Sequence, residues 1–149
     1  MRLRSNGPEE TFRYGDRLGR LLKAGSTVCL FGELGAGKTV FVKGIASALG
    51  IPEREITSAS FTIIAEYVGM LRSSPVPFYH VDLYRIRDQN ELESIGIEEY
   101  IGKRGIAVVE WAEKLGGFEG CISVRFEILD GEEREIEIEG MDEADWHNQ

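Results

Sequence analysis

The segment from Gly32 to Thr39 carries the clearest chemical signal in this sequence. It reads Gly-Glu-Leu-Gly-Ala-Gly-Lys-Thr and matches the phosphate-binding pattern Gly-x-x-x-x-Gly-Lys-Ser/Thr at every fixed position. In such loops, consecutive backbone N–H groups and the start of the following helix attract anionic phosphates. We expect Lys38 to contact the β- and γ-phosphates of a nucleoside triphosphate and the Thr39 hydroxyl to bind Mg²⁺.

The residues on both sides of this loop support the same interpretation. Residues 27–31 are apolar and rich in β-forming types, and residues 40–49 form a helix-length segment that is followed by Gly50. A strand, a glycine-rich loop and a helix in this order are the context that the pattern requires. The segment is therefore predicted to be a P-loop, and a chance glycine-rich turn is the weaker alternative.

Two acidic residues, Asp82 and Glu110, each end an apolar strand-like run. A charge at the end of a buried strand is costly unless it is paired or bound to a metal. Triphosphate hydrolysis also needs a carboxylate near Mg²⁺ and a group that positions the attacking water. We expect one acid to serve the Mg²⁺ shell and the other to orient water. The pattern alone does not assign them, and a salt bridge or a helix cap is the alternative for either one.

Four hydroxyl side chains lie between residues 57 and 62, ahead of Asp82. In nucleotide-dependent switches, a segment at this place closes over the γ-phosphate and loosens after hydrolysis. Serine and threonine are also common in turns and at strand starts. The segment is thus a candidate switch, with an ordinary turn as the alternative.

The remaining patterns predict one α/β domain over residues 1–149. Helices are expected to begin at Pro8 and at Asp88, because proline favours a first helical turn and Asp88-Gln89-Asn90-Glu91 resembles a capping box. We expect a P-loop NTPase-like, three-layer domain with a mixed sheet, parallel at its centre with antiparallel additions. The β-rich runs are residues 61–68, 76–84, 105–110, 121–128 and 134–139, of which the first two and the last two are expected to pair as hairpins.

Composition narrows the class of protein. The 149 residues are 42% hydrophobic and 29% charged, as in globular proteins, and no apolar run approaches the ~20 residues of a membrane span. Residues 1–8 lack the apolar stretch of a secretory signal, and Cys29 and Cys121 lie in apolar runs typical of buried free thiols. We therefore expect a cytoplasmic protein without a membrane partner.

The net charge of −9 is concentrated near the end of the chain. Residues 127–145 hold ten acidic residues and one basic residue, Arg134. Such a segment repels phosphate backbones, so direct nucleic-acid binding through it is not expected. We predict a solvated strand face followed by a disordered acidic tail at residues 141–149, with a docking surface for a basic partner as the alternative.

Taken together, the motifs resemble the TsaE family, the bacterial ATPases of tRNA threonylcarbamoyladenosine synthesis. The resemblance extends from Glu9 to about Ile138. It implies a small P-loop α/β domain that binds ATP and Mg²⁺, hydrolyses ATP and acts with the TsaB–TsaD assembly, meeting tRNA only indirectly through that assembly. The motifs that carry it are GELGAGKT, TSASFTIIAEY, FYHVDLYRI, ELESIGIEEY and VVEWAEKL.

The resemblance also implies roles for individual residues. Thr39 and Glu110 would hold Mg²⁺, and Asp82 would act in hydrolysis together with Lys38 and the switch residue Ser60. The usual Ser-Pro-Thr of the switch reads Ser-Ala-Ser here, so the hydroxyl is kept and the proline that would stiffen the segment is absent. His80 is interpreted as a buried core residue, and Trp111 could equally serve in packing. The implied nucleotide-binding residues are Leu34, Gly35, Ala36, Gly37, Lys38, Thr39, Thr11 and Trp111.

Three other functions compete with this interpretation. A GTP switch is disfavoured, because no asparagine of the chain begins the Asn-Lys-x-Asp run that reads guanine. A small-molecule kinase would need an arginine-rich lid to exclude water, and the best candidate, residues 85–87, is short. A nucleotide-gated binding module with negligible turnover stays open as an alternative.

Overall fold

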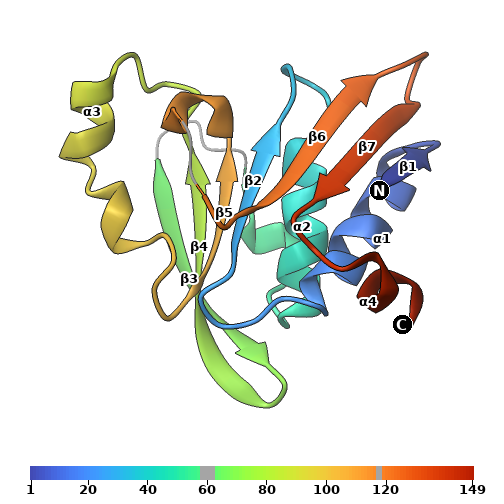
Figure 1. The fold of residues 1–149 in the computed structure, drawn as a ribbon, viewed down its shortest axis with the longest axis horizontal. Helices are drawn as coiled ribbons and strands as arrows, with labels where there is room; N and C mark the ends of the chain where they lie inside the picture. Colours follow the sequence, from blue (N-terminus) through green and yellow to red (C-terminus); the bar gives the residue numbers. More distant parts are fainter. Residues whose placement is uncertain (58–62, 117–118) are drawn as a thin grey trace.

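A seven-stranded mixed sheet lies at the centre of the computed structural model, which describes residues 1–57, 63–116 and 119–149 (Figure 1). The strand order is β1-β7-β6-β2-β5-β4-β3. The strands are β1 (Arg2–Ser5), β2 (Thr27–Phe31), β3 (Ile64–Leu71), β4 (Ser74–Asp82), β5 (Ile106–Glu110), β6 (Ile122–Ile128) and β7 (Arg134–Glu139).

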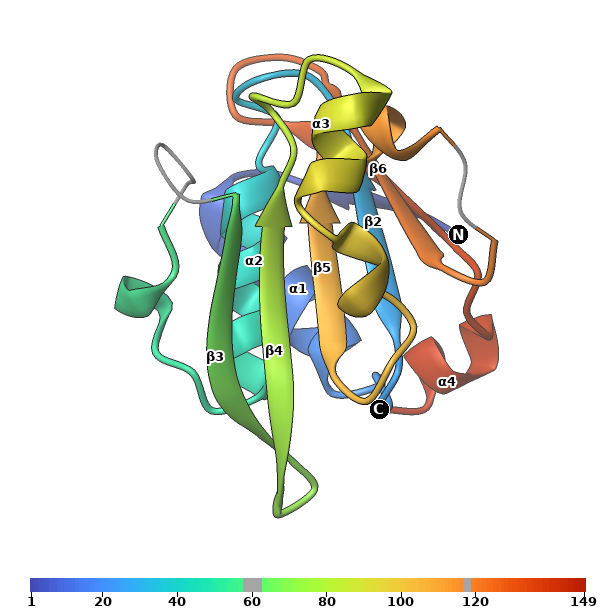
Figure 2. The same ribbon diagram turned by 90° about the vertical axis from the view of Figure 1, so that its left-hand side faces the viewer.

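Helices cover both faces of the sheet, which confirms the three-layer architecture. Helices α1 and α2 lie on one face, and α3 with the short turn η2 lies on the other (Figure 2). None of the helices in the described ranges is long and apolar enough to cross a bilayer. The helices are α1 (Pro8–Gly19), α2 (Lys38–Ala48), α3 (Gln89–Ser94) and α4 (Glu143–His147), and the 3-10 turns are η1 (Glu53–Glu55), η2 (Ile97–Glu99) and η3 (Ala112–Leu115).

The centre of the sheet is parallel and its margins are antiparallel, as predicted. Strands β6, β2, β5 and β4 pair in parallel, whereas β3, β7 and β1 are added in antiparallel fashion. All five residues of β5 are buried, as expected for a strand covered on both faces. Parallel strands end at the same edge of a sheet. The residues that follow β2, β4 and β5 therefore lie close together at that edge.

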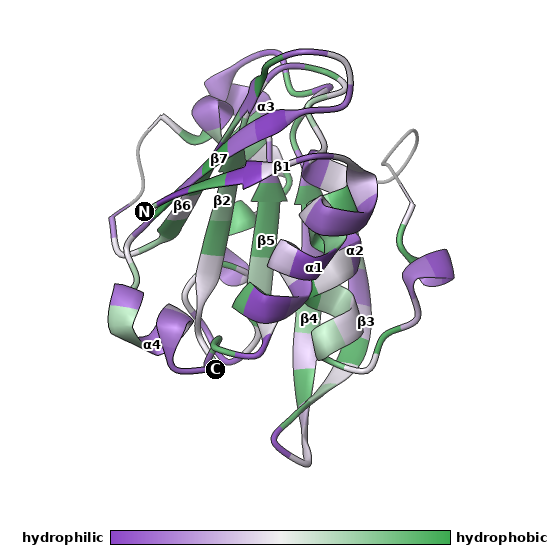
Figure 3. Cartoon of the chain, turned by 90° about the vertical axis from the view of Figure 1, so that its right-hand side faces the viewer, coloured by the Kyte–Doolittle hydropathy of each residue, from purple (hydrophilic) through white to green (hydrophobic). Residues whose placement is uncertain are grey.

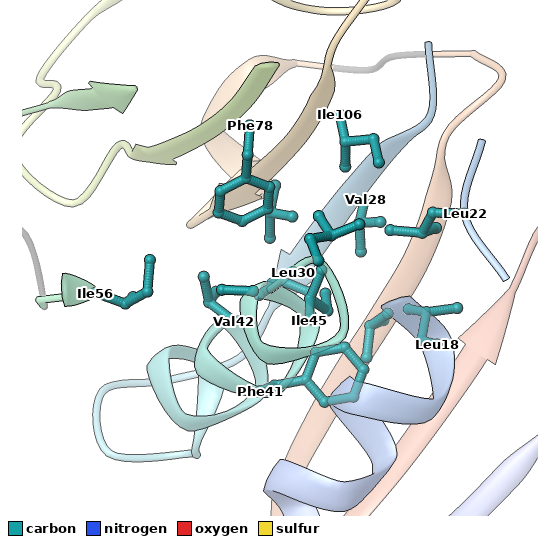
Figure 4. Close-up of a cluster of buried hydrophobic side chains, with 14 of the residues drawn as sticks. Leu18, Leu22, Val28, Leu30, Phe41, Val42, Ile45, Ile56, Phe78 and Ile106 are labelled. Carbon is teal, nitrogen blue, oxygen red and sulfur yellow. The ribbon is translucent and has the colours of Figure 1, made fainter. Parts of the chain in front are cut away.

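Close packing of α1 against α2 fixes the helix that follows the P-loop. A Cβ atom added at Gly15 would lie 2.3 Å from the Phe41 carbonyl oxygen, and one at Gly44 would lie 2.2 Å from that of Phe12. The two backbones therefore approach as closely as glycine allows. Between these two helices and the sheet, apolar side chains of α1 and α2 pack onto β2, β4 and β5 (Figure 4).

The end of the chain is ordered, contrary to the predicted disordered tail at residues 141–149. Helix α4 begins after Asp142, whose carboxylate accepts a hydrogen bond from the Ala144 N–H at 2.8 Å. Trp146 is only 1% exposed, and the guanidinium of Arg17 lies 4.6 Å from the centre of its ring. The Trp146 ring also lies 6.2 Å from that of Tyr14, so burial of this indole holds α4 against α1 (Figure 1). Hydrophilic residues otherwise make up much of α4 (Figure 3).

The two cysteines are free thiols, as predicted. Cys29 is buried in β2, and Cys121 is half-buried just before β6. Burial raises the pKa of Cys29 well above its ordinary value, which keeps this thiol protonated and unreactive.

Candidate nucleotide and metal site

The P-loop connects the end of β2 to the first turn of α2. Helix α2 begins at Lys38, and the residue before it, Gly37, has a left-handed φ of 104°. Other residue types rarely adopt this angle, so glycine is needed where the loop turns into the helix. The first N–H groups of α2 have no partner within the helix and carry its positive dipole end, which suits an anion.

A cavity of about 420 Å³ lies over this loop. Strand register places Asp82 of β4 directly beside Glu110 of β5, and both residues line this cavity. The structure thus gathers the predicted loop residues, both acids and Trp111 around one space, although they come from three distant parts of the sequence. The cavity is lined by residues 34–40, Asp82, Tyr84, Arg85, Glu110 and Trp111.

Glu110 is held through both of its carboxylate oxygens. The Thr39 hydroxyl donates a hydrogen bond to Oε1 at 2.9 Å, and Nε2 of His80 lies 2.5 Å from Oε2. His80 and Glu110 are 3% and 2% exposed, so this pair is shielded from water. His80 is therefore buried, as interpreted from the sequence, but it also orients an acid of the site.

The oxygen atoms of Thr39 and Glu110 are suitable ligands for Mg²⁺, a hard cation that prefers oxygen. Within the described ranges, no group of three or more histidine, cysteine or acidic side chains is arranged to hold a metal. Mg²⁺ commonly takes few protein ligands and completes its shell with phosphate oxygens and water. The donor set at this place thus fits a nucleotide-bound Mg²⁺ rather than a metal held by protein alone.

Asp82 is positioned by the backbone around it. Its Oδ1 accepts a hydrogen bond from the Tyr84 N–H at 2.9 Å, and its own N–H donates to the carbonyl of Ile63 at 2.8 Å. The side chain is 8% exposed and lines the cavity. A carboxylate fixed in this way can accept a hydrogen bond from a water molecule in the cavity.

Lys38 is buried and turned back onto its own loop. Its Nζ donates hydrogen bonds to the carbonyls of Gly32 and Glu33 and lies 3.4 Å from the centre of the Trp111 ring. Desolvation by burial lowers the pKa of Lys38 below its ordinary value. Trp111 therefore contacts the cation of the loop, which is more than a packing role.

Lys114 is a residue of this region that the sequence analysis did not identify. Its Nζ donates to the carbonyls of Tyr84 at 2.5 Å and Ile86 at 2.8 Å, and so joins the turn after β5 to the loop after β4. The Tyr84 and Trp111 rings also contact each other here, with their centroids 5.1 Å apart. A lone lysine in a short turn gives no sequence signal for such a bridge.

Two predicted residues are not among the described residues that line the cavity. Ser60 lies at residues 58–62, outside the ranges that the structure describes. Thr11 is buried in α1, where its hydroxyl lies 2.7 Å from that of Ser5. Its methyl group lies 3.6 Å from where a Cβ of Gly37 would be, so Thr11 supports the loop from behind. Thr11 itself does not line the cavity.

The family model "Threonylcarbamoyl adenosine biosynthesis protein TsaE" matches residues 5–138 of this chain. The chain belongs to the TsaE family. A TsaE relative from Treponema pallidum, named "tRNA threonylcarbamoyladenosine biosynthesis protein TsaE", is 41% identical over 93% of this chain and 99% of its own length. A TsaE of the same name from Aquifex aeolicus is 36% identical over 87% of this chain and 89% of its own.

The fold agrees with a solved structure. The crystal structure of Bacillus subtilis YdiB aligns with this TsaE-family chain at a TM-score of 0.72 and 34% identity. The alignment covers 93% of this chain and 83% of that one. The resemblance inferred from the motifs is thereby confirmed at the level of family and fold.

Proposed function

We propose that this TsaE-family protein is a cytoplasmic Mg²⁺-dependent ATPase subunit of the machinery that makes threonylcarbamoyladenosine in tRNA. The contact that carries the proposal joins the Thr39 hydroxyl to Glu110 beside the P-loop. It supplies the two oxygens that a nucleotide-bound Mg²⁺ requires from the protein. The names of the relatives support the place in tRNA modification.

In this proposal, the loop and three side chains of the cavity besides Lys38 have defined roles. The loop amides and Lys38 bind the phosphates, so Lys38 leaves the carbonyls of Gly32 and Glu33 when nucleotide enters. Thr39 and Glu110 hold Mg²⁺, which when bound neutralises the charge of the phosphate oxygens. Asp82 orients the attacking water, because its carboxylate lines the cavity next to Glu110.

The proposed partner is the TsaB–TsaD assembly, with tRNA reached only through it. The net charge of −9 supports an indirect contact, since an acidic protein is repelled by the phosphates of RNA. We propose slow ATP hydrolysis by the isolated chain and faster hydrolysis when the partner completes the site.

Phosphate release from ATP, measured with and without purified TsaB–TsaD, tests this function. We expect Mg²⁺-dependent release that increases when the assembly is added, and more threonylcarbamoyladenosine in a reconstituted reaction that contains this chain. Nucleotide binding without partner-stimulated release would favour a nucleotide-gated module instead. Release that depends on a small phosphoryl acceptor would favour a kinase.

A further inference from the structure

Arg134, the one basic residue between residues 127 and 145, contacts the P-loop from the far end of the sequence. Its Nη2 donates a hydrogen bond to the Gly35 carbonyl at 3.1 Å, and its Nε donates to the Ala36 carbonyl at 3.2 Å. The P-loop and the connection between β6 and β7 lie at the same end of the sheet (Figures 1 and 2). The arginine therefore joins two segments that are about 100 residues apart.

The same guanidinium is fixed on its other side by its own turn. Nη1 donates to the carbonyls of Gly131 at 2.8 Å and Glu133 at 2.9 Å. The Glu133 carboxylate is bound separately by Arg4 of β1 at 2.7 Å. Four carbonyl oxygens on two segments thus share one planar cation, an arrangement that the fork geometry of arginine allows and a lysine ammonium cannot reproduce.

Holding these two carbonyls fixes the direction of the neighbouring amides. In a trans peptide, the C=O of one residue and the N–H of the next point in opposite directions. Anchoring the Ala36 carbonyl on Arg134 therefore turns the Gly37 N–H away from Arg134 at the first turn of α2, while the Ala36 N–H stays bonded inside the loop to the Glu33 carbonyl at 3.1 Å. Glycine at positions 35 and 37 would otherwise leave these peptide planes free to rotate.

We propose that Arg134 is a positioning residue of the P-loop, which pre-orients the Gly37 amide for the phosphates of the nucleotide. The inference rests on the proposed nucleotide binding and extends it to a residue outside the cavity. The benefit is pre-organisation: amides already aimed at the anion are not reordered when it binds. It also explains why a basic side chain lies at the start of a strand that is otherwise lined with acids.

The test compares Arg134→Gln and Arg134→Lys with Arg4→Gln as the matched control. Arg4→Gln removes the same charge and a bond to the same turn, but it leaves the P-loop contacts intact. We expect both Arg134 variants to bind a non-hydrolysable ATP analogue with Mg²⁺ about tenfold more weakly in calorimetry, a change typical of one lost charge-assisted contact. The control should stay within about twofold of the unmodified protein.

Residue-resolved hydrogen exchange without nucleotide provides a second readout. We expect the Ala36 amide, which is bonded to the Glu33 carbonyl at 3.1 Å, to exchange faster in Arg134→Gln, because the Gly35–Ala36 peptide has lost its anchor. The melting temperature and the exchange of β2 and β5 amides should stay unchanged. Unchanged affinity and exchange in Arg134→Gln, or full recovery with Arg134→Lys, would overturn the positioning role. Failure of the unmodified protein to bind the analogue would instead overturn the proposed function, and Ala36 exchange would still decide whether Arg134 holds the loop.

Discussion

The Thr39 hydroxyl donates a hydrogen bond of 2.9 Å to Glu110, 71 residues further along the chain. Thr39 lies in the first turn of α2 and Glu110 ends β5, so the contact exists only because β2 and β5 are neighbours in the sheet. It brings together two oxygen donors at the mouth of the P-loop.

Glu110→Gln is expected to abolish most Mg²⁺-dependent ATP hydrolysis without unfolding the protein. The amide keeps the size of the side chain and can still accept the Thr39 hydrogen bond, but it lacks the charge that Mg²⁺ requires. We expect turnover to fall on the order of a hundredfold, measured as phosphate release across a magnesium series. Nucleotide affinity in the presence of a chelator should not change. An unaltered magnesium dependence would contradict the assignment of Glu110 as the metal ligand.

Asp82→Asn is expected to separate binding from turnover. Asparagine Oδ1 can still accept the hydrogen bond from the Tyr84 N–H, so the local backbone should stay in place. Hydrolysis should fall on the order of a hundredfold because the group that orients water has lost its charge. Calorimetry with a non-hydrolysable analogue should give a dissociation constant close to that of the unmodified protein. If binding collapses as well, Asp82 rather than Glu110 is the metal ligand.

Lys38→Ala is expected to weaken ATP binding by about 2 kcal/mol, roughly thirtyfold, since a charge-assisted contact to phosphate is lost. Lys43→Ala is the control, because Lys43 lies on the same helix and does not line the cavity. Titration calorimetry on both variants measures the difference. Equal affinities for the two variants would remove Lys38 from the phosphate site.

Nucleotide binding is expected to take up a proton at alkaline pH. Burial lowers the pKa of Lys38 below its ordinary 10.5, whereas phosphate favours the charged form and would raise it again. Above the lowered pKa, the complex therefore holds more protons than the free protein, and affinity falls as the pH rises. Calorimetry in two buffers of different ionisation enthalpy measures the uptake. Well below the lowered pKa, where Lys38 is charged in both states, this uptake should vanish.

Trp146→Ala is expected to lower the free energy of unfolding by about 3 kcal/mol, because a fully buried indole leaves a cavity and the Arg17 cation loses its ring. Asp145→Ala, an exposed position on the same helix, should have little effect. Urea denaturation of both variants checks the difference. A null effect of Trp146→Ala would mean that α4 does not contribute to the fold.

Several features of the structure could be predicted because neighbouring residues determine them. Residues 27–49 alone specify the order of strand, glycine loop and helix. The hairpin of β3 and β4 requires only two β-rich segments that follow each other in the chain. The capped start of α3 at Asp88, whose carboxylate accepts the Glu91 N–H, is equally local. Strand β1 was missed, because four residues with two arginines give no strand pattern, and only pairing with β7 makes it a strand.

The sequence alone was enough to predict the chemistry and the family: a loop with the phosphate-binding pattern, two acids at strand ends and the motifs of the TsaE family. Which distant groups meet became clear only from the folded chain. It paired His80 with Glu110, brought Arg134 to the loop and buried Trp146 against α1. These contacts depend on strand order and packing between segments far apart in the chain. Local residue patterns do not encode them, because each partner taken alone looks like an ordinary core or surface residue.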